Sequence, residues 1–167
     1  MTEPIYTRPA TWDDVLDLAR RLNRHGARFV LVGGYALAAH GLTRMTTDID
    51  VAVDPHPDNS RRWIAALAEL PDGVARELSR EADPFQGDTL HAIRINDEFT
   101  VDVMPSVAGI PFDTLTTHAQ TMMFDGEPVP VLDLAGLLLT KQGQRPKDQA
   151  DAQLLREALR RLRVQEP

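Results

Sequence analysis

Apolar positions along the chain follow two periods, one typical of helices and one typical of strands. Positions 15, 18, 19 and 22 repeat at helical spacing behind a capping pattern of Thr11 and Asp14, which predicts a helix over 12–25. The apolar run 28–32 predicts a short buried strand, and the alternating run 48–53 predicts a second strand.

The same rules predict the remaining elements, although residues 71–88 give no clear pattern. These elements are a short helix over 35–40, a helix from 57 through 70, a hairpin of 89–96 with 98–104, a second hairpin around the turn at 125–126, and helices over 133–142 and 147–163. This order predicts an α+β (α/β) fold with a mixed β-sheet flanked by helices. We expect an irregular arm at 1–10 and a single domain at 11–167, with 131–163 as its C-terminal helical part.

Composition narrows the class of protein. The 167 residues are 43% hydrophobic and 26% charged, which is ordinary for a folded globular protein. The chain has no cysteine, which excludes disulfides and zinc–thiolate sites. It has no apolar run of about 18 residues, and residues 1–10 show neither a basic nor an apolar segment, so we expect no signal peptide. We therefore expect a cytoplasmic protein with no membrane partner. The net charge of −7 argues against a large nucleic-acid footprint but leaves room for a small anionic substrate.

Two of the predicted strands carry carboxylates opposite their apolar face. Side chains two positions apart share one face of a strand, so Asp48 and Asp50 point the same way, and Asp102 takes the corresponding place in 98–104. Two carboxylates about 4 Å apart repel by roughly 4 kcal/mol at an effective dielectric constant of about 20. If the two strands are neighbours, the three acids offer the oxygen ligands that Mg²⁺ binds. The alternative is a solvated strand end with no ligand.

Two glycines separate the first strand from the short helix. Gly33 and Gly34 predict a tight turn whose free backbone amides face an anion, with the positive potential of a helix N-terminus behind them. A plain turn between strand and helix is the alternative. The combination with the following Arg44-x-Thr46-x-Asp48 pattern favours the anion site.

The stretch GGYALAAHGLTRMTTDIDVAV resembles the active-site signature of the nucleotidyltransferase superfamily, whose fold is that of DNA polymerase β. The resemblance is closest to the branch of AbiEii-type toxins. It implies a catalytic and metal-binding set of Asp48, Asp50 and Asp102, and a nucleotide-binding set of Gly33, Gly34, Arg44, Thr46 and Lys141. Many relatives have Gly-Ser at the turn; here Gly34 replaces the serine, so its phosphate contact falls to backbone amides.

A second stretch, LLLTKQGQRPKDQADAQLL, resembles the Lys…Arg-x-Lys-Asp-x-x-Asp motif of the same branch. The resemblance implies a substrate-side set of Arg145, Lys147, Asp148 and Asp151, beside Lys141. Helical stripes independently direct Lys141 and the two aspartates toward the domain body. Helix capping with an internal lysine–aspartate pair is the alternative. His40 is expected to line the site, whereas the other histidines show no ligand spacing.

The resemblance implies an enzyme that moves a nucleoside monophosphate from an NTP to an acceptor, with Mg²⁺ or Mn²⁺ as cofactor. The acceptor would be a tRNA end, a protein hydroxyl or a small molecule. The setting would be a toxin–antitoxin or phage-defence system with a possible antitoxin partner. Two alternatives stay open: a non-catalytic relative that binds a nucleotide or a partner, and an ordinary α/β binding domain whose motifs are coincidental.

Overall fold

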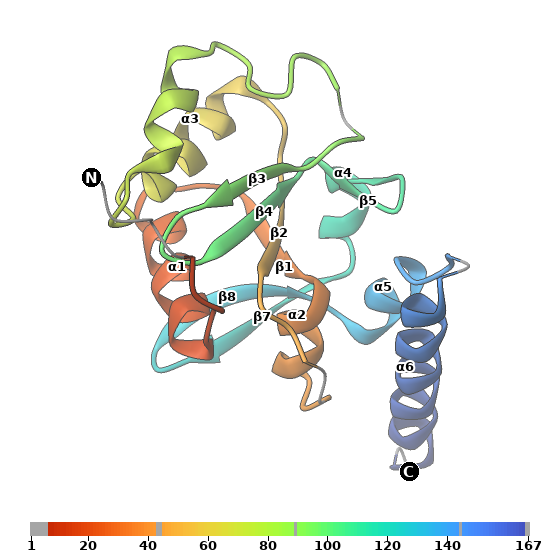
Figure 1. Ribbon diagram of the computed structural model, residues 1–167. Coiled ribbons are helices and arrows are strands. Elements are labelled where there is room, and N and C mark those ends of the chain that lie inside the picture. The colour runs from red at the N-terminus through yellow and green to blue at the C-terminus, as the bar shows by residue number, and fades with distance from the viewer. Residues whose placement is uncertain (1–6, 43–44, 89, 144, 166–167) are drawn as a thin grey trace.

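A six-stranded β-sheet forms the centre of the computed structural model, which describes residues 7–42, 45–88, 90–143 and 145–165. The strands lie in the order β3-β4-β2-β1-β8-β7, so strands distant along the chain become neighbours (Figure 1). Their bounds are Ile93–Asn96 (β3), Thr100–Met104 (β4), Ile49–Val53 (β2), Phe29–Val32 (β1), Glu127–Leu132 (β8) and Ala119–Phe124 (β7). The β2–β4 and β1–β8 pairs are parallel and the other three are antiparallel, which confirms the predicted mixed sheet.

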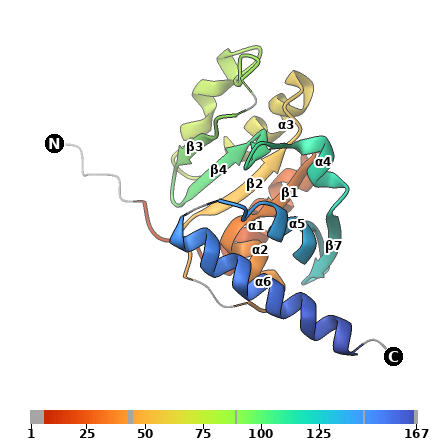
Figure 2. The ribbon, with the colours of Figure 1, turned by 90° about the vertical axis from the view of Figure 1, so that its right-hand side faces the viewer.

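Helices flank this sheet. Figure 1 shows α1 (Trp12–Arg24) and α3 (Pro57–Leu67) on one side, with α5 (Leu134–Leu139) and α6 (Pro146–Gln165) on the other. Figure 2 faces the side of α5 and α6, which pack against each other, and α2 (Gly33–Ala39) contacts β1, β2 and α5. The short remaining elements are β5 (Ser106–Val107), β6 (Ile110–Pro111), α4 (Phe112–Thr116) and a 3₁₀ helix, η1 (Val74–Arg80). Within the described part of the chain, no helix has the length and apolar character needed to cross a membrane.

Alternation along β2 and β4 decides which side chains enter the hydrophobic core. The buried residues on one face of these two strands are Ile49, Val51, Val53, Val101 and Val103. Because neighbouring side chains in a strand point to opposite faces, Asp50 and Asp102 lie on the other face. The parallel register pairs these two residues directly. The apolar residues therefore fix the face on which the acids lie.

Several predicted boundaries were wrong. The helix α2 begins at Gly33, so the two glycines belong to its first turn instead of preceding it, and β2 begins at Ile49, which leaves Asp48 just outside the strand. The first arm of the hairpin begins at Ile93 instead of 89, because only four residues pair with β4. The helices α3 and α5 are also shorter than predicted, whereas the Thr11–Asp14 capping box of α1 is confirmed.

Asp97 lies in the predicted hairpin turn, but its side chain is an internal hydrogen-bond acceptor for a distant segment. Its side chain is fully buried. Its carboxylate accepts backbone hydrogen bonds from Asp72 (2.9 Å), Val74 (3.1 Å) and Glu98 (2.8 Å). A charged acceptor satisfies amides that would otherwise be buried without partners. Asp97 therefore connects the hairpin that carries Asp102 to segment 71–88, which contains η1 and whose sequence shows no clear pattern.

Candidate active site

Three carboxylates meet where β2 and β4 lie side by side. Asp50 and Asp102 are direct partners in the parallel register, and Asp48 immediately precedes β2. All three line one cavity of about 480 Å³. The rest of its lining consists of Gly33, Gly34, Met45, Thr46, Thr47, Arg94, Lys141, Arg145 and Lys147. The structure therefore brings together the three acids and most of the predicted nucleotide-binding residues.

Asp50 lies in an environment that disfavours its negative charge. Burial, followed by the charge of Asp102 and a hydrogen bond with it, raises the pKa of Asp50 to about 7. The charge of Asp48 acts in the same direction, and Lys141 opposes it. Desolvation and neighbouring like charges both favour the neutral acid. The centre of the site is therefore short of positive charge.

Arg94 is the basic residue in direct contact with the acids. Its Nε donates to Asp102 Oδ1 (2.9 Å) and its Nη2 donates to Asp102 Oδ2 (3.1 Å). The same Nη2 lies 3.5 Å from Asp48 Oδ2. Two parallel charge-assisted hydrogen bonds are the strong geometry for an arginine–carboxylate pair. The guanidinium of Arg94 therefore contacts two of the three acids, Asp102 and Asp48, and makes no ion pair with Asp50 that the structure shows.

Sequence reasoning missed Arg94. The antiparallel register places it directly opposite Asp102, because β3 pairs with β4 around residues 97–99. A signal was present: Arg94 is the one charge within the run Ile93–Asn96, and it alternates with two isoleucines. With the hairpin register in hand, a cation opposite an unexplained aspartate would have been expected.

The two glycines allow backbone to approach the acids closely. Gly33 has φ of +71°, and a Cβ at this position would collide with the Asp50 carboxylate. A Cβ at Gly34 would lie 2.7 Å from the Cβ of Thr46. Only glycine combines a left-handed conformation with so close an approach. At Gly34 the close approach of Thr46 alone favours a residue without a side chain.

The second motif forms a compact cluster of charges. The Nζ of Lys141 lies 3.1 Å from Asp151 Oδ2 and 3.7 Å from Asp148 Oδ1, and the Nε of Arg145 donates to Asp148 Oδ2 (3.0 Å). Exposed side-chain fractions of 12% for Lys141, 7% for Asp148 and 5% for Asp151 show that these three side chains are largely buried, whereas Arg145 is exposed. A buried lysine needs such partners.

Both interpretations of the second motif have support in the structure. The internal lysine–aspartate pair exists, as the capping alternative predicts. Lys141, Arg145 and Lys147 also line the cavity that holds the acids, as the substrate-side interpretation requires. Lys141 therefore lines the cavity of the acids and also forms an ion pair with Asp151 of α6.

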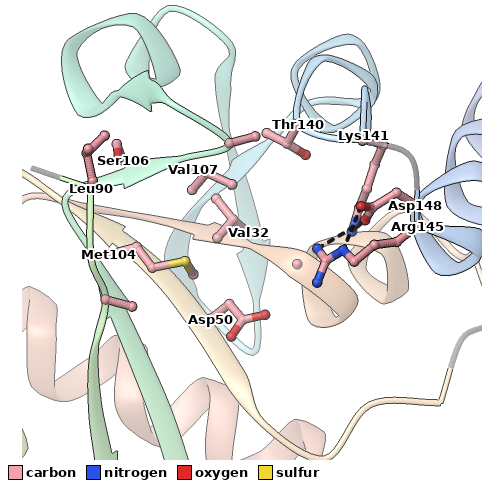
Figure 3. A pocket seen from close by; sticks show the side chains of 14 residues that line it. Val32, Asp50, Leu90, Met104, Ser106, Val107, Thr140, Lys141, Arg145 and Asp148 are labelled. Atoms are coloured by element: carbon pink, nitrogen blue, oxygen red, sulfur yellow. Dashed lines mark hydrogen bonds and ion pairs between the residues drawn. The ribbon is translucent and has the colours of Figure 1, made fainter.

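A second cavity of about 510 Å³ adjoins the first, and Figure 3 shows it from close by. The two cavities share Gly33, Asp50, Lys141 and Arg145. The rest of the second lining, much of it small or apolar, consists of Val32, Leu90, Ala92, Met104, Ser106, Val107, Ala108, Thr140, Gly143 and Asp148. Asp50 and Lys141 thus stand between a highly charged compartment and a more apolar one.

One expected site residue, His40, lies outside this arrangement, and a second, Arg44, is not among the described residues. His40 lines neither cavity; its ring Nε2 lies 2.9 Å from the carbonyl oxygen of Leu132. The expectation that His40 lines the site was therefore wrong, because the ring is engaged by the end of β8 instead. Arg44 lies outside the described residues.

Two solved structures share this architecture. A putative nucleotidyltransferase (TM1012) from Thermotoga maritima is 16% identical, covers 89% of this chain and 92% of its own, and aligns with a TM-score of 0.54. The antibiotic-resistance factor ANT(2'')-Ia is 14% identical, covers 87% of this chain and 82% of its own, and aligns with a TM-score of 0.52. At such identities the likeness concerns the fold, which is the polymerase β-like fold of the nucleotidyltransferases, as predicted.

Within that class the sequence itself gives the family. Residues 17–158 match the family described as nucleotidyl transferase AbiEii toxin, type IV toxin–antitoxin system. The match spans most of the chain, so this protein belongs to the AbiEii nucleotidyltransferase family, as the motifs predicted. No curated protein matches the sequence.

The donor chemistry of the acid cluster fits a hard divalent cation. It offers three carboxylates, and burial together with the neighbouring acids outweighs the effect of Lys141 and raises the pKa of Asp50. Within the described residues, however, no group of three or more histidine, aspartate or glutamate side chains is arranged to hold a metal ion. Arg94 instead engages Asp102 and Asp48. The carboxylates are thus the kind of ligand that a divalent cation binds. In this structure two of them bind the guanidinium of Arg94.

Proposed function

We propose that this chain transfers a nucleoside monophosphate from an NTP to an acceptor hydroxyl, with Mg²⁺ or Mn²⁺ bound by Asp48, Asp50 and Asp102. The observation that carries this proposal is the meeting of the three acids in one cavity with Gly33 and Lys141. The shortage of positive charge at Asp50 supports it. When bound, the ion supplies charge stabilisation for the attacking and leaving oxygens of an in-line displacement.

Basic side chains and glycine backbone line the cavity around the acids, and we propose that they bind the nucleotide. Lys141, Arg145 and Lys147 line the same cavity, and charge-assisted hydrogen bonds from such groups bind phosphate. The first turn of α2 adds the backbone of Gly33 and Gly34, which lines the same cavity. The proposed nucleotide-binding set is Gly33, Gly34, Arg44, Thr46 and Lys141, with Arg145, Lys147, Asp148 and Asp151 on the substrate side.

In the proposed reaction, the acceptor oxygen bonds to the α-phosphorus of the NTP and the bond to pyrophosphate breaks. The proton of the acceptor hydroxyl passes to Asp102, which faces the cavity from β4. Both oxygens of Asp102 accept hydrogen bonds from Arg94 in the structure described here. Because both oxygens are already engaged, Asp102 needs release from Arg94 before it takes the proton.

The family description supports a biological setting. We propose that the chain acts in the cytoplasm as the toxin of a type IV toxin–antitoxin system, with an antitoxin protein as partner. The proposed acceptor classes are a tRNA end, a protein hydroxyl and a small molecule. The net charge of −7 weighs against an acceptor that needs a broad basic surface.

Label transfer tests the reaction directly. The chain is incubated with each α-³²P-labelled NTP, Mg²⁺ and cell extract, and the labelled molecule is then identified. We expect labelling by the wild type and its loss in Asp50→Asn and Asp102→Asn. Asp54→Asn is the matched control, because Asp54 lies at the opposite end of β2 and pairs with Arg28. Full labelling by folded Asp50→Asn and Asp102→Asn proteins would remove these acids from the mechanism.

One observation favours a second candidate function, a non-catalytic relative that binds a nucleotide. Arg94 already neutralises part of the acid cluster, as a site that has no metal requires. Nucleotide binding that is unchanged by chelation of divalent ions, without label transfer to RNA, protein or small molecules, would establish this second function.

A further inference from the structure

Arg94 occupies the oxygens that a divalent ion requires. Its two hydrogen bonds engage both oxygens of Asp102, and its Nη2 also approaches Asp48. A guanidinium and a divalent cation at the same carboxylates repel each other, since both carry positive charge at short distance. The contacts of Arg94 and full metal ligation by these acids are therefore competing states of one site.

The position of Arg94 allows it to leave the acids. Its side chain is 59% exposed, whereas that of Asp102 is 15% exposed. It lies on β3, one of the two edge strands of the sheet, so the far side of β3 pairs with no further strand among the described residues. An exposed arginine on an edge strand changes rotamer without disturbing the core. The freed guanidinium stays at the cavity, where the phosphates of an NTP offer it a new partner.

We propose that Arg94 is a displaceable counter-ion of the acid site, a positioning residue that holds Asp102 and Asp48 in place until a divalent cation replaces it. The inference rests on the proposed metal-dependent function. Without metal, Arg94 limits the repulsion among the three acids. On metal binding, it releases Asp102, which then serves as ligand and proton acceptor. Arg94 thereby raises the concentration of divalent ion that is needed to occupy the site.

Metal affinity in the absence of substrate tests this inference. Mn²⁺ binding to the chelator-treated chain is measured by electron paramagnetic resonance for the wild type, Arg94→Gln and Arg94→Lys. We expect Arg94→Gln to bind Mn²⁺ about tenfold more tightly than the wild type, because the competing ion pair is gone. Arg94→Lys retains the charge but lacks the planar fork, and we expect an intermediate affinity.

Arg28→Gln is the matched control. Arg28 pairs with Asp54 at 2.6 Å, with side-chain exposures of 56% and 19% that resemble those of Arg94 and Asp102. Neither Arg28 nor Asp54 lines the two cavities at the acids. The Arg28→Gln substitution removes a comparable ion pair at the other end of β2, so we expect the Mn²⁺ affinity to be unchanged.

The outcomes separate this inference from the function on which it rests. Tighter Mn²⁺ binding by Arg94→Gln, with no change in Arg28→Gln, supports the displacement of Arg94. Equal or weaker binding by both Arg94 variants, alongside measurable binding by the wild type that Asp50→Asn abolishes, overturns the inference and leaves the proposed function intact. No Mn²⁺ binding by any of these proteins, with or without an NTP, overturns both.

Discussion

Asp50 offers a direct physical test of the acid cluster, because its charge opposes folding when no metal is bound. The perturbation is Asp50→Asn, which keeps the shape of the side chain and removes its charge. Burial and the neighbouring carboxylates raise the pKa of Asp50 from 3.8 to about 7. We expect the Asp50→Asn protein to be more stable than the wild type at pH 8 in the presence of a chelator.

The magnitude follows from the pKa difference between the folded and unfolded states. A rise of about three pKa units corresponds to about 4 kcal/mol, and we expect a gain of about 2–4 kcal/mol because the neighbouring acids relax in part. The sign is set by proton binding. Between pH 4 and 7 the folded state keeps a proton that the unfolded state has released, so the stability of the wild type falls as the pH rises. The advantage of Asp50→Asn therefore appears across this window and persists above it.

Urea unfolding at pH 4.5, 6 and 8, with chelator present, measures this difference. A gain of 2–4 kcal/mol also corresponds to a rise of about 5–15 °C in melting temperature for a domain of this size. Asp54→Asn, which loses the ion pair with Arg28, should show no gain at any pH. Mg²⁺ should narrow the difference, because the metal stabilises the wild type more than the variant. A difference between Asp50→Asn and wild type that is absent at pH 8, or equal at all three pH values, would refute the reasoning.

Two further substitutions test the parts that surround the acids. Gly33→Ala places a side chain against the Asp50 carboxylate at a residue with φ of +71°, so we expect a loss of about 1–3 kcal/mol in the free energy of unfolding, measured with urea. Gly126→Ala, which has a similar φ but meets no neighbouring atom, separates backbone strain from the collision; equal losses would exclude the collision. Lys141→Met leaves Asp148 and Asp151 buried without their lysine, so we expect a loss of about 3–5 kcal/mol in the same assay. A loss below about 1 kcal/mol in the free energy of unfolding would mean that water solvates the cluster and that Lys141 contributes little to stability.

Local pattern was sufficient for much of the fold. The alternation in 48–53 and 98–104 predicted both central strands and the face on which their acids lie, because burial of the valines forces the aspartates outward. Boundaries were less accurate where they depend on a partner. β3 begins at Ile93 because its pairing with β4 ends at the Ile93–Val103 pair, and local pattern does not show where that pairing ends.

Motifs predicted the members of the candidate site, whereas contacts between distant residues revealed its state. Asp48, Asp50 and Lys141 were all named from their surroundings in the sequence, and they line one cavity. The contact of Arg94 with Asp102 was not foreseen, because it depends on the hairpin register. The burial of Asp97 likewise depends on amides some 25 residues away along the chain.

The sequence by itself determined which residue types are available: acids in or beside two alternating strands, two glycines where a strand meets a helix, and a lysine on the same stripe as its neighbouring leucines. Only the tertiary structure decided that β2 and β4 are parallel neighbours, so that Asp50 faces Asp102, and that Arg94 reaches both Asp102 and Asp48. The physical reason is that side-chain direction is a local property of the backbone. Distance between strands and the electrostatic balance of a site depend instead on which segments the whole core brings together.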